Sequence, residues 1–153
     1  MSETSLVILI IPVFIVCFVL FWSLIVLLIS RLAGWAELAR QYPARGPATG
    51  RTFAMRSARF GLLGSYRNCL TVTLSLAGIH MQPMIVFRMG HPPLLIPWTA
   101  IVSLSRRDVM FSPAARLKVK DAETGGVKEI TFYGGALVEA LEAHARTYKI
   151  DQE

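Results

Sequence analysis

The chain has 153 residues, of which 54% are hydrophobic and 17% charged, with a formal net charge of +6. A chain of this size with one long apolar run has room for one compact domain of about 110 residues besides that run, which excludes a transporter or channel with many spans. Residues 68–153 carry nine basic and eight acidic side chains, and this balance argues against a nucleic-acid-binding protein, whose basic surface should lie on the folded domain.

The first element is a membrane-spanning helix. Leu6 to Ile29 are 24 consecutive residues without a charge, and as a helix they measure about 36 Å, enough to cross a hydrocarbon core of about 30 Å. We therefore expect a short extracytoplasmic tail over 1–5 and a transmembrane helix over 6–30. A cleaved signal peptide is disfavoured, because a basic n-region, a short apolar core and a small-residue cleavage site are all missing.

Arginines set the expected orientation. No Lys or Arg precedes the span, whereas seven arginines and one glutamate follow it in residues 31–67, which predicts an external N-terminus and a cytoplasmic domain. This arginine-rich segment either attracts anionic lipid or only fixes the topology, and both interpretations stay open.

A juxtamembrane helix and a linker are expected over 31–51. Apolar residues from Leu32 to Tyr42 recur at helical spacing, so the helix should continue past the membrane until Pro43 ends it. Residues 43–50 have the composition of a linker. The expected contacts with the membrane surface are Arg31, Trp35, Arg40 and Arg45.

After the linker, the apolar residues alternate with a period of two, which is typical of strands with one buried face. The expected strands are 52–57, 69–77, 79–87, 94–96, 100–107, 115–120 and 127–133. An amphipathic helix is expected over 136–148 and a tail over 149–153. The fold class is therefore mainly β with α: about seven antiparallel strands in a barrel or sandwich, capped by a C-terminal helix.

Two stretches carry a family resemblance. Residues 93–101, Pro-Leu-Leu-Ile-Pro-Trp-Thr-Ala-Ile, and residues 130–134, Ile-Thr-Phe-Tyr-Gly, the latter running into the helix, make residues 52–148 resemble bacterial pleckstrin-homology-like and GRAM-like domains. The resemblance implies a platform that binds lipids, peptides or proteins. It also implies that the loop between the first two strands can meet anionic lipid, here through Arg56, Arg59 and Arg67. Because dense Lys/Arg clustering is missing there, we expect a loose electrostatic contact rather than recognition of a specific headgroup.

Candidate chemistry is sparse. His80, His91 and His144 have no Cys or carboxylate at metal-ligand spacing, and the two cysteines, Cys17 and Cys69, would be separated by the membrane. We therefore expect no catalytic residue, metal, cofactor or disulfide. Trp98 and Arg88 are candidates for a binding groove, although a tryptophan at a strand bend more often fills a core.

These features predict a single-pass adaptor or scaffold at the cytoplasmic face of a membrane, the bacterial inner membrane if the resemblance holds, with an unidentified protein partner. The alternative is a small accessory subunit that contacts a larger membrane enzyme or transporter through its transmembrane helix. An aromatic stripe that includes Phe14, Phe18 and Trp22 could serve that contact, or it could face lipid.

Overall fold

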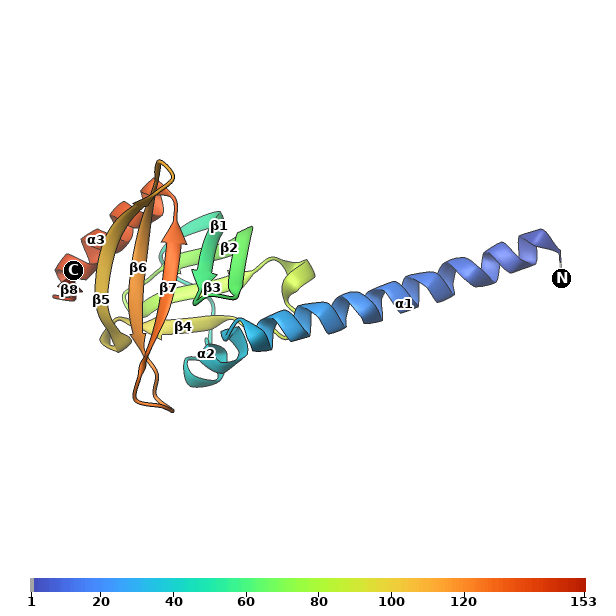
Figure 1. The fold of residues 1–153 in the computed structure, drawn as a ribbon, viewed down its shortest axis with the longest axis horizontal. Coiled ribbons are helices and arrows are strands. Elements are labelled where there is room, and N and C mark those ends of the chain that lie inside the picture. The colour runs from blue at the N-terminus through green and yellow to red at the C-terminus, as the bar shows by residue number, and fades with distance from the viewer. Residues whose placement is uncertain (1) are drawn as a thin grey trace.

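The structure, a computed structural model, describes residues 2–153. Helix α1 (Glu3–Leu32) extends from the folded domain as one long rod (Figure 1). It is long and apolar enough to cross a membrane, and none of its most apolar window is buried in protein. The expectation of a helix of spanning length near the N-terminus is confirmed.

The expected continuous juxtamembrane helix is wrong, because the chain turns sharply after α1. Gly34 adopts a left-handed conformation with φ of 81°, and a separate short helix, α2 (Trp35–Gln41), follows it. Glycine reaches this conformation without the steric cost that other residues meet. The turn folds α2 back against the domain, where Trp35, Leu38 and Ala39 are buried in its core.

The domain is built on one open sheet of eight strands in the order β4-β3-β2-β1-β7-β6-β5-β8. All neighbouring strands are antiparallel except β5 and β8, which are parallel. The strands are β1 (Arg51–Phe60), β2 (Gly64–Leu74), β3 (Gly78–Pro83), β4 (Leu94–Pro97), β5 (Ile101–Val109), β6 (Ser112–Lys120), β7 (Val127–Tyr133) and β8 (Asp151–Gln152). The expected class, mainly β with α, is confirmed, but the sheet has eight strands and is open, so the expected closure into a barrel is corrected. The eighth strand was not expected, because its two residues in the supposed tail are too few to show a period.

The largest differences from the expected strand boundaries occur in two regions. The supposed loop over 58–67 consists mostly of strand, because β1 and β2 extend on both sides of a turn at residues 61–63. Conversely, β3 ends at Pro83, and residues 85–87 form the 3-10 helix η1 (Ile85–Phe87) instead of more strand.

Helix α3 (Gly135–Thr147) packs against β5, β6 and β7. Leu137, Val138 and Leu141 on α3 are completely buried. A second 3-10 helix, η2 (Trp98–Ala100), follows β4. The Trp98 ring stacks on His144 and Tyr148 with ring centroids 5.0 and 5.2 Å away, which fixes the C-terminal end of α3.

Candidate functional site

The C-terminal end of α1 is attached to the domain by its side chains. Trp22 donates a hydrogen bond from Nε1 to the carbonyl oxygen of Val86 at 3.2 Å, and its ring lies 5.9 Å from that of Phe87. The Ser30 hydroxyl donates to the carbonyl oxygen of Gly90. The segment between β3 and β4 therefore lies along α1, although about 60 residues separate them in the sequence.

An aromatic cluster holds α2 and the same segment together. The Trp35 ring lies 5.3 to 5.5 Å from the rings of Phe60, Tyr66 and His91, and its Nε1 donates to the carbonyl oxygen of Pro92 at 2.9 Å. Trp35 is completely buried, so the expected contact of its side chain with the membrane surface is corrected. An indole ring collects at a membrane interface only where no protein core covers it.

His91 and Tyr66 form a buried polar pair within that cluster. The Tyr66 hydroxyl lies 2.9 Å from His91 Nε2, while His91 Nδ1 lies 3.2 Å from the carbonyl oxygen of Met89. A carbonyl only accepts, so Nδ1 carries the hydrogen and Nε2 accepts from the hydroxyl. Burial lowers the pKa of His91 and raises that of Tyr66, which keeps both groups neutral.

Polar contacts attach α2 to the hairpin between β6 and β7. The Asp121 carboxylate accepts hydrogen bonds from Gln41 at 2.9 Å and from the backbone N–H of Glu123 at 3.0 Å. Lys128 forms ion pairs with Glu37 at 2.8 Å and with Asp121 at 3.6 Å. Burial opposes the charged form of Asp121, but these hydrogen bonds outweigh it and hold the pKa of the carboxyl well below its usual range.

Two of the expected lipid-contacting arginines share one face of the sheet, and one of them lies beside α1. Arg59 on β1 and Arg67 on β2 are exposed on the same face of neighbouring strands, since Arg59 pairs with Ser65 and the alternate residues are buried. Arg67, Val26 and further residues of α1, β2 and η1 line a cavity of about 160 Å³. Arg31 at the end of α1 and Arg88 just after η1 are also exposed.

The remaining expected site residues lie elsewhere. Arg56 is half-buried over the Phe53 ring, 5.7 Å from its centroid. Arg40 pairs with Glu123 at 3.8 Å. Packing thus accounts for Arg56 and Trp98, whereas the Arg40 side chain remains 70% exposed beside Glu123.

Arg45 and Trp98 require correction. Arg45 lies in the linker beside Ser75 and Ala77, at the end of β2 opposite to the one that meets α1, so it lies apart from Arg31 and Arg67. Trp98 is 5% exposed and donates from Nε1 to the carbonyl oxygen of Ser75 at 2.9 Å. It therefore fills the core instead of lining a groove with Arg88.

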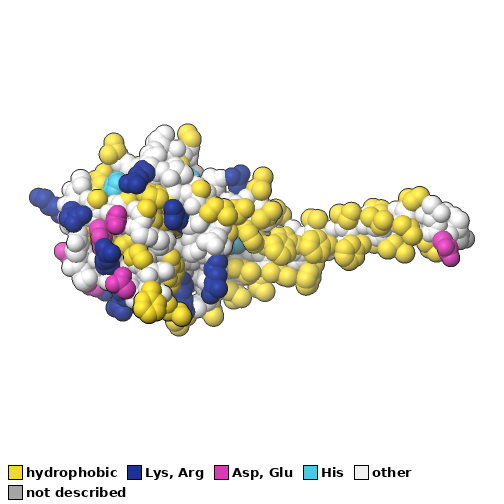
Figure 2. Space-filling view, turned by 90° about the horizontal axis from the view of Figure 1, so that it is seen from above, with side chains coloured by type: hydrophobic (Ala, Val, Ile, Leu, Met, Phe, Trp, Pro, Cys, Tyr) yellow, Lys and Arg dark blue, Asp and Glu magenta, His cyan; other side chains and the backbone are white. Residues whose placement is uncertain are grey.

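The apolar surface of α1 continues onto the near end of the domain (Figure 2). Leu62 and Leu63, at the turn between β1 and β2, are strongly exposed there. They line an apolar groove of about 570 Å³ together with Leu32 and Gly34 at the corner between α1 and α2. Sequence reasoning treated these leucines only as part of a loop, although a Gly-Leu-Leu-Gly tip was the available signal.

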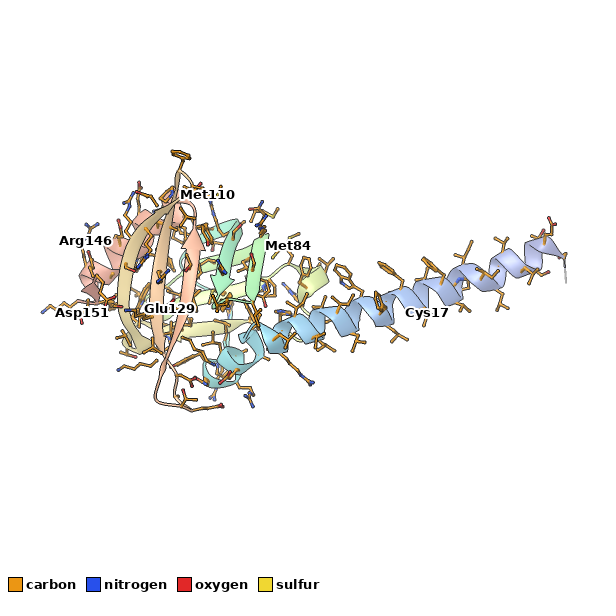
Figure 3. All side chains as sticks on the ribbon, in the orientation of Figure 1. Cys17, Met84, Met110, Glu129, Arg146 and Asp151 are labelled. Atoms are coloured by element: carbon orange, nitrogen blue, oxygen red, sulfur yellow. The ribbon has the colours of Figure 1, made fainter. Side chains whose placement is uncertain are left out.

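A second exposed apolar site lies at the hairpin between β5 and β6. Met110 is 90% exposed and Phe111 is fully exposed, and both have positive φ, 47° and 69°. Figure 3 shows Met110 near the upper tip of the domain, which points across the direction of α1, whereas Met84 lies on the side of the domain that α1 approaches. The sequence signal was a large apolar pair where a two-residue hairpin turn normally has Asn or Gly.

Within residues 2–153, no group of three His, Cys, Asp or Glu side chains is placed to hold a metal ion. Cys17, on α1, is exposed and Cys69 is buried, and both are free thiols. Comparisons of this chain with protein-family models, with curated proteins and with solved structures found no match.

Proposed function

We propose that this protein is a single-pass, membrane-anchored binding module that presents a protein-docking surface near the cytoplasmic face of a membrane. The single observation that carries the docking role is the exposed apolar tip, Val109 to Phe111, at the end of β5 and β6. The anchor and its attachment to the domain support the membrane role.

The backbone conformation of the tip lowers the stability of the folded domain. Left-handed conformations at residues other than glycine cost about 1–2 kcal/mol each in regular structure, and Met110 and Phe111 both adopt them. Neither side chain is buried in return. Residues that destabilise the local structure without a compensating contact occur most often at functional sites. Exposed aromatic and methionine side chains are also typical anchors of protein interfaces.

The edges of the sheet also favour a protein-docking surface at this tip. The β4 edge is covered by the linker, because Pro43 bridges to Leu94 and the Leu95 N–H donates to the carbonyl oxygen of Tyr42. On the other edge, β8 pairs only with Ser103 and Leu104 of β5. Residues 105–109 of β5 lead directly to the tip, and an extended peptide could add there as a further strand.

A pleckstrin-homology-like fold is our interpretation of the domain. Its support is the arrangement of two antiparallel meanders, β1 to β4 and β5 to β7, joined by pairing of β1 with β7 and followed by α3. Domains of that kind serve mainly as binding platforms, which agrees with the proposed role.

The proposed orientation places the domain in the cytoplasm and the start of α1 outside, because the arginines follow the span. Arg67, beside α1, and Arg59, on the same exposed face of the neighbouring strand, would then contact anionic headgroups. Replacing both by Gln should lower the phosphatidylglycerol that copurifies with the full chain, as measured by mass spectrometry. The control replaces Arg106 and Arg107, and equal lipid content in the two variants would contradict the contact.

The docking role is tested by cross-linking from native membranes followed by identification of the captured protein. One variant replaces residues 6–20 with an unrelated apolar helix. This variant keeps Trp22 and the later residues of α1 that attach the helix to the domain. A second carries Met110→Ser and Phe111→Ser, and its matched control carries Leu76→Ser at another strongly exposed turn. We expect one stoichiometric protein to be retained by the helix replacement and the control, and lost by the tip variant.

A specific observation favours one alternative. Phe14, Phe18 and Trp22 form a stacked aromatic row on α1, with 6.4 Å between successive ring centroids. Such a row could contact a helix of a larger membrane protein, which would make this chain an accessory subunit. In that case the replacement of residues 6–20 should lose the captured protein and the tip variant should retain it.

A further inference from the structure

We propose that the segment from Met84 to Met89, which includes η1, enters the lipid leaflet beside α1 as a second membrane contact. This inference rests on the proposed function, since it requires α1 to span a membrane. It assigns to the domain itself an embedded element that fixes its orientation on the bilayer.

The segment is apolar and uncovered. Its side chains, Met84, Ile85, Val86 and Met89, are between 41% and 74% exposed, and no residue of η1 is buried. Four neighbouring exposed apolar side chains form a patch of the kind that marks a membrane or protein contact. The one charged side chain of the segment, Arg88, is long enough to reach toward the headgroups from an apolar setting.

The expected depth of η1 in the membrane follows from its contacts with α1. About 20 helical residues cross the hydrocarbon core, so within the uncharged stretch Leu6–Ile29 its boundary on the domain side lies between residues 25 and 29. Trp22 is three to seven residues further in, or about 5 to 10 Å below that boundary. Because Trp22 bonds directly to the Val86 carbonyl at 3.2 Å, η1 lies at the same depth. Segments that lie in the membrane interface insert to about this depth.

The carbonyl oxygens of the segment are mostly paired within the protein. An irregular chain in lipid must have its polar groups paired inside the protein, because no water is present to bind them. Between residues 84 and 90, six of the seven carbonyl oxygens have a donor within the protein, and three of the seven N–H groups, those of Met84, Phe87 and Arg88, have an acceptor. The carbonyl pairs are Met84 with the Phe87 N–H, Ile85 with the Arg88 N–H, Val86 with Trp22, Arg88 with the His91 N–H, Met89 with His91 Nδ1, and Gly90 with Ser30. The other four N–H groups require partners from the headgroup region, which places the segment at the interface and not deep in the hydrocarbon core.

A fixed position distinguishes this segment from a freely moving apolar loop. It is attached at Trp22, at Ser30 and, through Pro92, at the buried Trp35. Gly90 lies so close to α1 that a Cβ there would be 2.4 Å from Leu27. The anchor therefore carries η1 to the membrane in a defined place, and lipid is the occupant that continuity with α1 favours.

The test measures the depth of a fluorescent label in the full chain, reconstituted in vesicles of phosphatidylcholine and phosphatidylglycerol. In a background with Cys17→Ser and Cys69→Ala, single cysteines are placed by Ile85→Cys, by Leu76→Cys as the matched exposed control, and by Phe14→Cys as the reference for the span. Each label is quenched separately by spin-labelled lipid and by aqueous iodide.

We expect quenching by lipid to be several-fold stronger at position 85 than at position 76, and quenching by iodide to show the reverse. If position 85 is as accessible to iodide as position 76 while position 14 is in lipid, the inference is wrong and the anchor stands. If position 85 is shielded from both quenchers, protein covers the segment, which also overturns the inference. If position 14 is not quenched by lipid, the anchor fails, and with it the proposed function.

Discussion

Gly90→Ala should loosen the attachment of the domain to α1. Gly90 has φ of 71°, where alanine costs about 1–2 kcal/mol. The new Cβ would also lie 2.4 Å from Leu27 Cδ2 and 3.4 Å from Leu27 Cα, and moving the Leu27 side chain off its rotamer adds about 0.5–1.5 kcal/mol. The total, about 2 kcal/mol, should increase local opening of this segment about 30-fold.

Hydrogen exchange of the full chain in detergent micelles measures this opening. The amides of Phe87 and His91, which are hydrogen-bonded within the segment, should exchange about 30-fold faster in the variant. Gly125→Ala is a matched control, because Gly125 has φ of 72° but open space around its Cα. It should accelerate exchange only in its own turn. Unchanged exchange at Phe87 and His91 in Gly90→Ala would refute the proposed close attachment.

Three further predictions concern the domain. A chain beginning at residue 43 should fail to fold, because removing the fully buried Trp35 alone should cost about 3–5 kcal/mol; a cooperative thermal transition of 43–153 at the full-length midpoint would contradict this. Asp121→Ala should lower the thermal midpoint more than Glu123→Ala does, because Asp121 accepts a hydrogen bond from Gln41 of α2 at 2.9 Å, whereas Glu123 meets α2 only through an exposed ion pair with Arg40 at 3.8 Å; equal midpoints would show that the Asp121 contact does not stabilise. Burial lowers the pKa of His91 in the folded state from its usual 6.5, so the unfolded state binds more protons below that value and the free energy of unfolding should fall as the pH drops below it. Denaturant unfolding of His91→Gln should show a smaller fall, and an identical pH dependence would contradict the assignment.

Periodicity predicted those elements whose pattern lies within their own residues. The long uncharged run of α1 and the alternation of apolar residues in the second half of β2 are examples. In contrast, the start of β2 was expected to be a loop, because Gly64, Ser65 and Arg67 obscure the alternation around Tyr66. The alternation of apolar and polar residues predicts a strand only where the buried face carries apolar side chains and the exposed face carries polar ones.

The end of β3 and the role of Trp35 depend on contacts that a local pattern does not contain. Residues 85–87, Ile-Val-Phe, are of types that favour strands, but the bond of Trp22 to Val86 and its contact with Phe87 hold them along α1. Likewise, Trp35 has the spacing of an interfacial residue, yet the turn at Gly34 brings it into the core. Tertiary contacts of this kind override local preference.

The candidate site was predicted in part. Arg59 and Arg67 share an exposed face because they lie on neighbouring strands with the same alternation, and Arg67 also lies beside α1. The tip at Met110 and Phe111 was missed, since large apolar residues are rarely expected in a two-residue turn. A departure from turn chemistry in an otherwise regular hairpin was the signal that marks this site.

The most direct test of the membrane-anchored account is labelling of intact cells with a membrane-impermeant maleimide. In the Cys17→Ser, Cys69→Ala background, one chain carries Ser2→Cys and a second carries Leu76→Cys, at opposite ends of the protein. The account predicts that position 2 reacts in intact cells and that position 76 reacts only after lysis. Reaction at position 76 in intact cells, or equal reaction of both positions only after lysis, would contradict it.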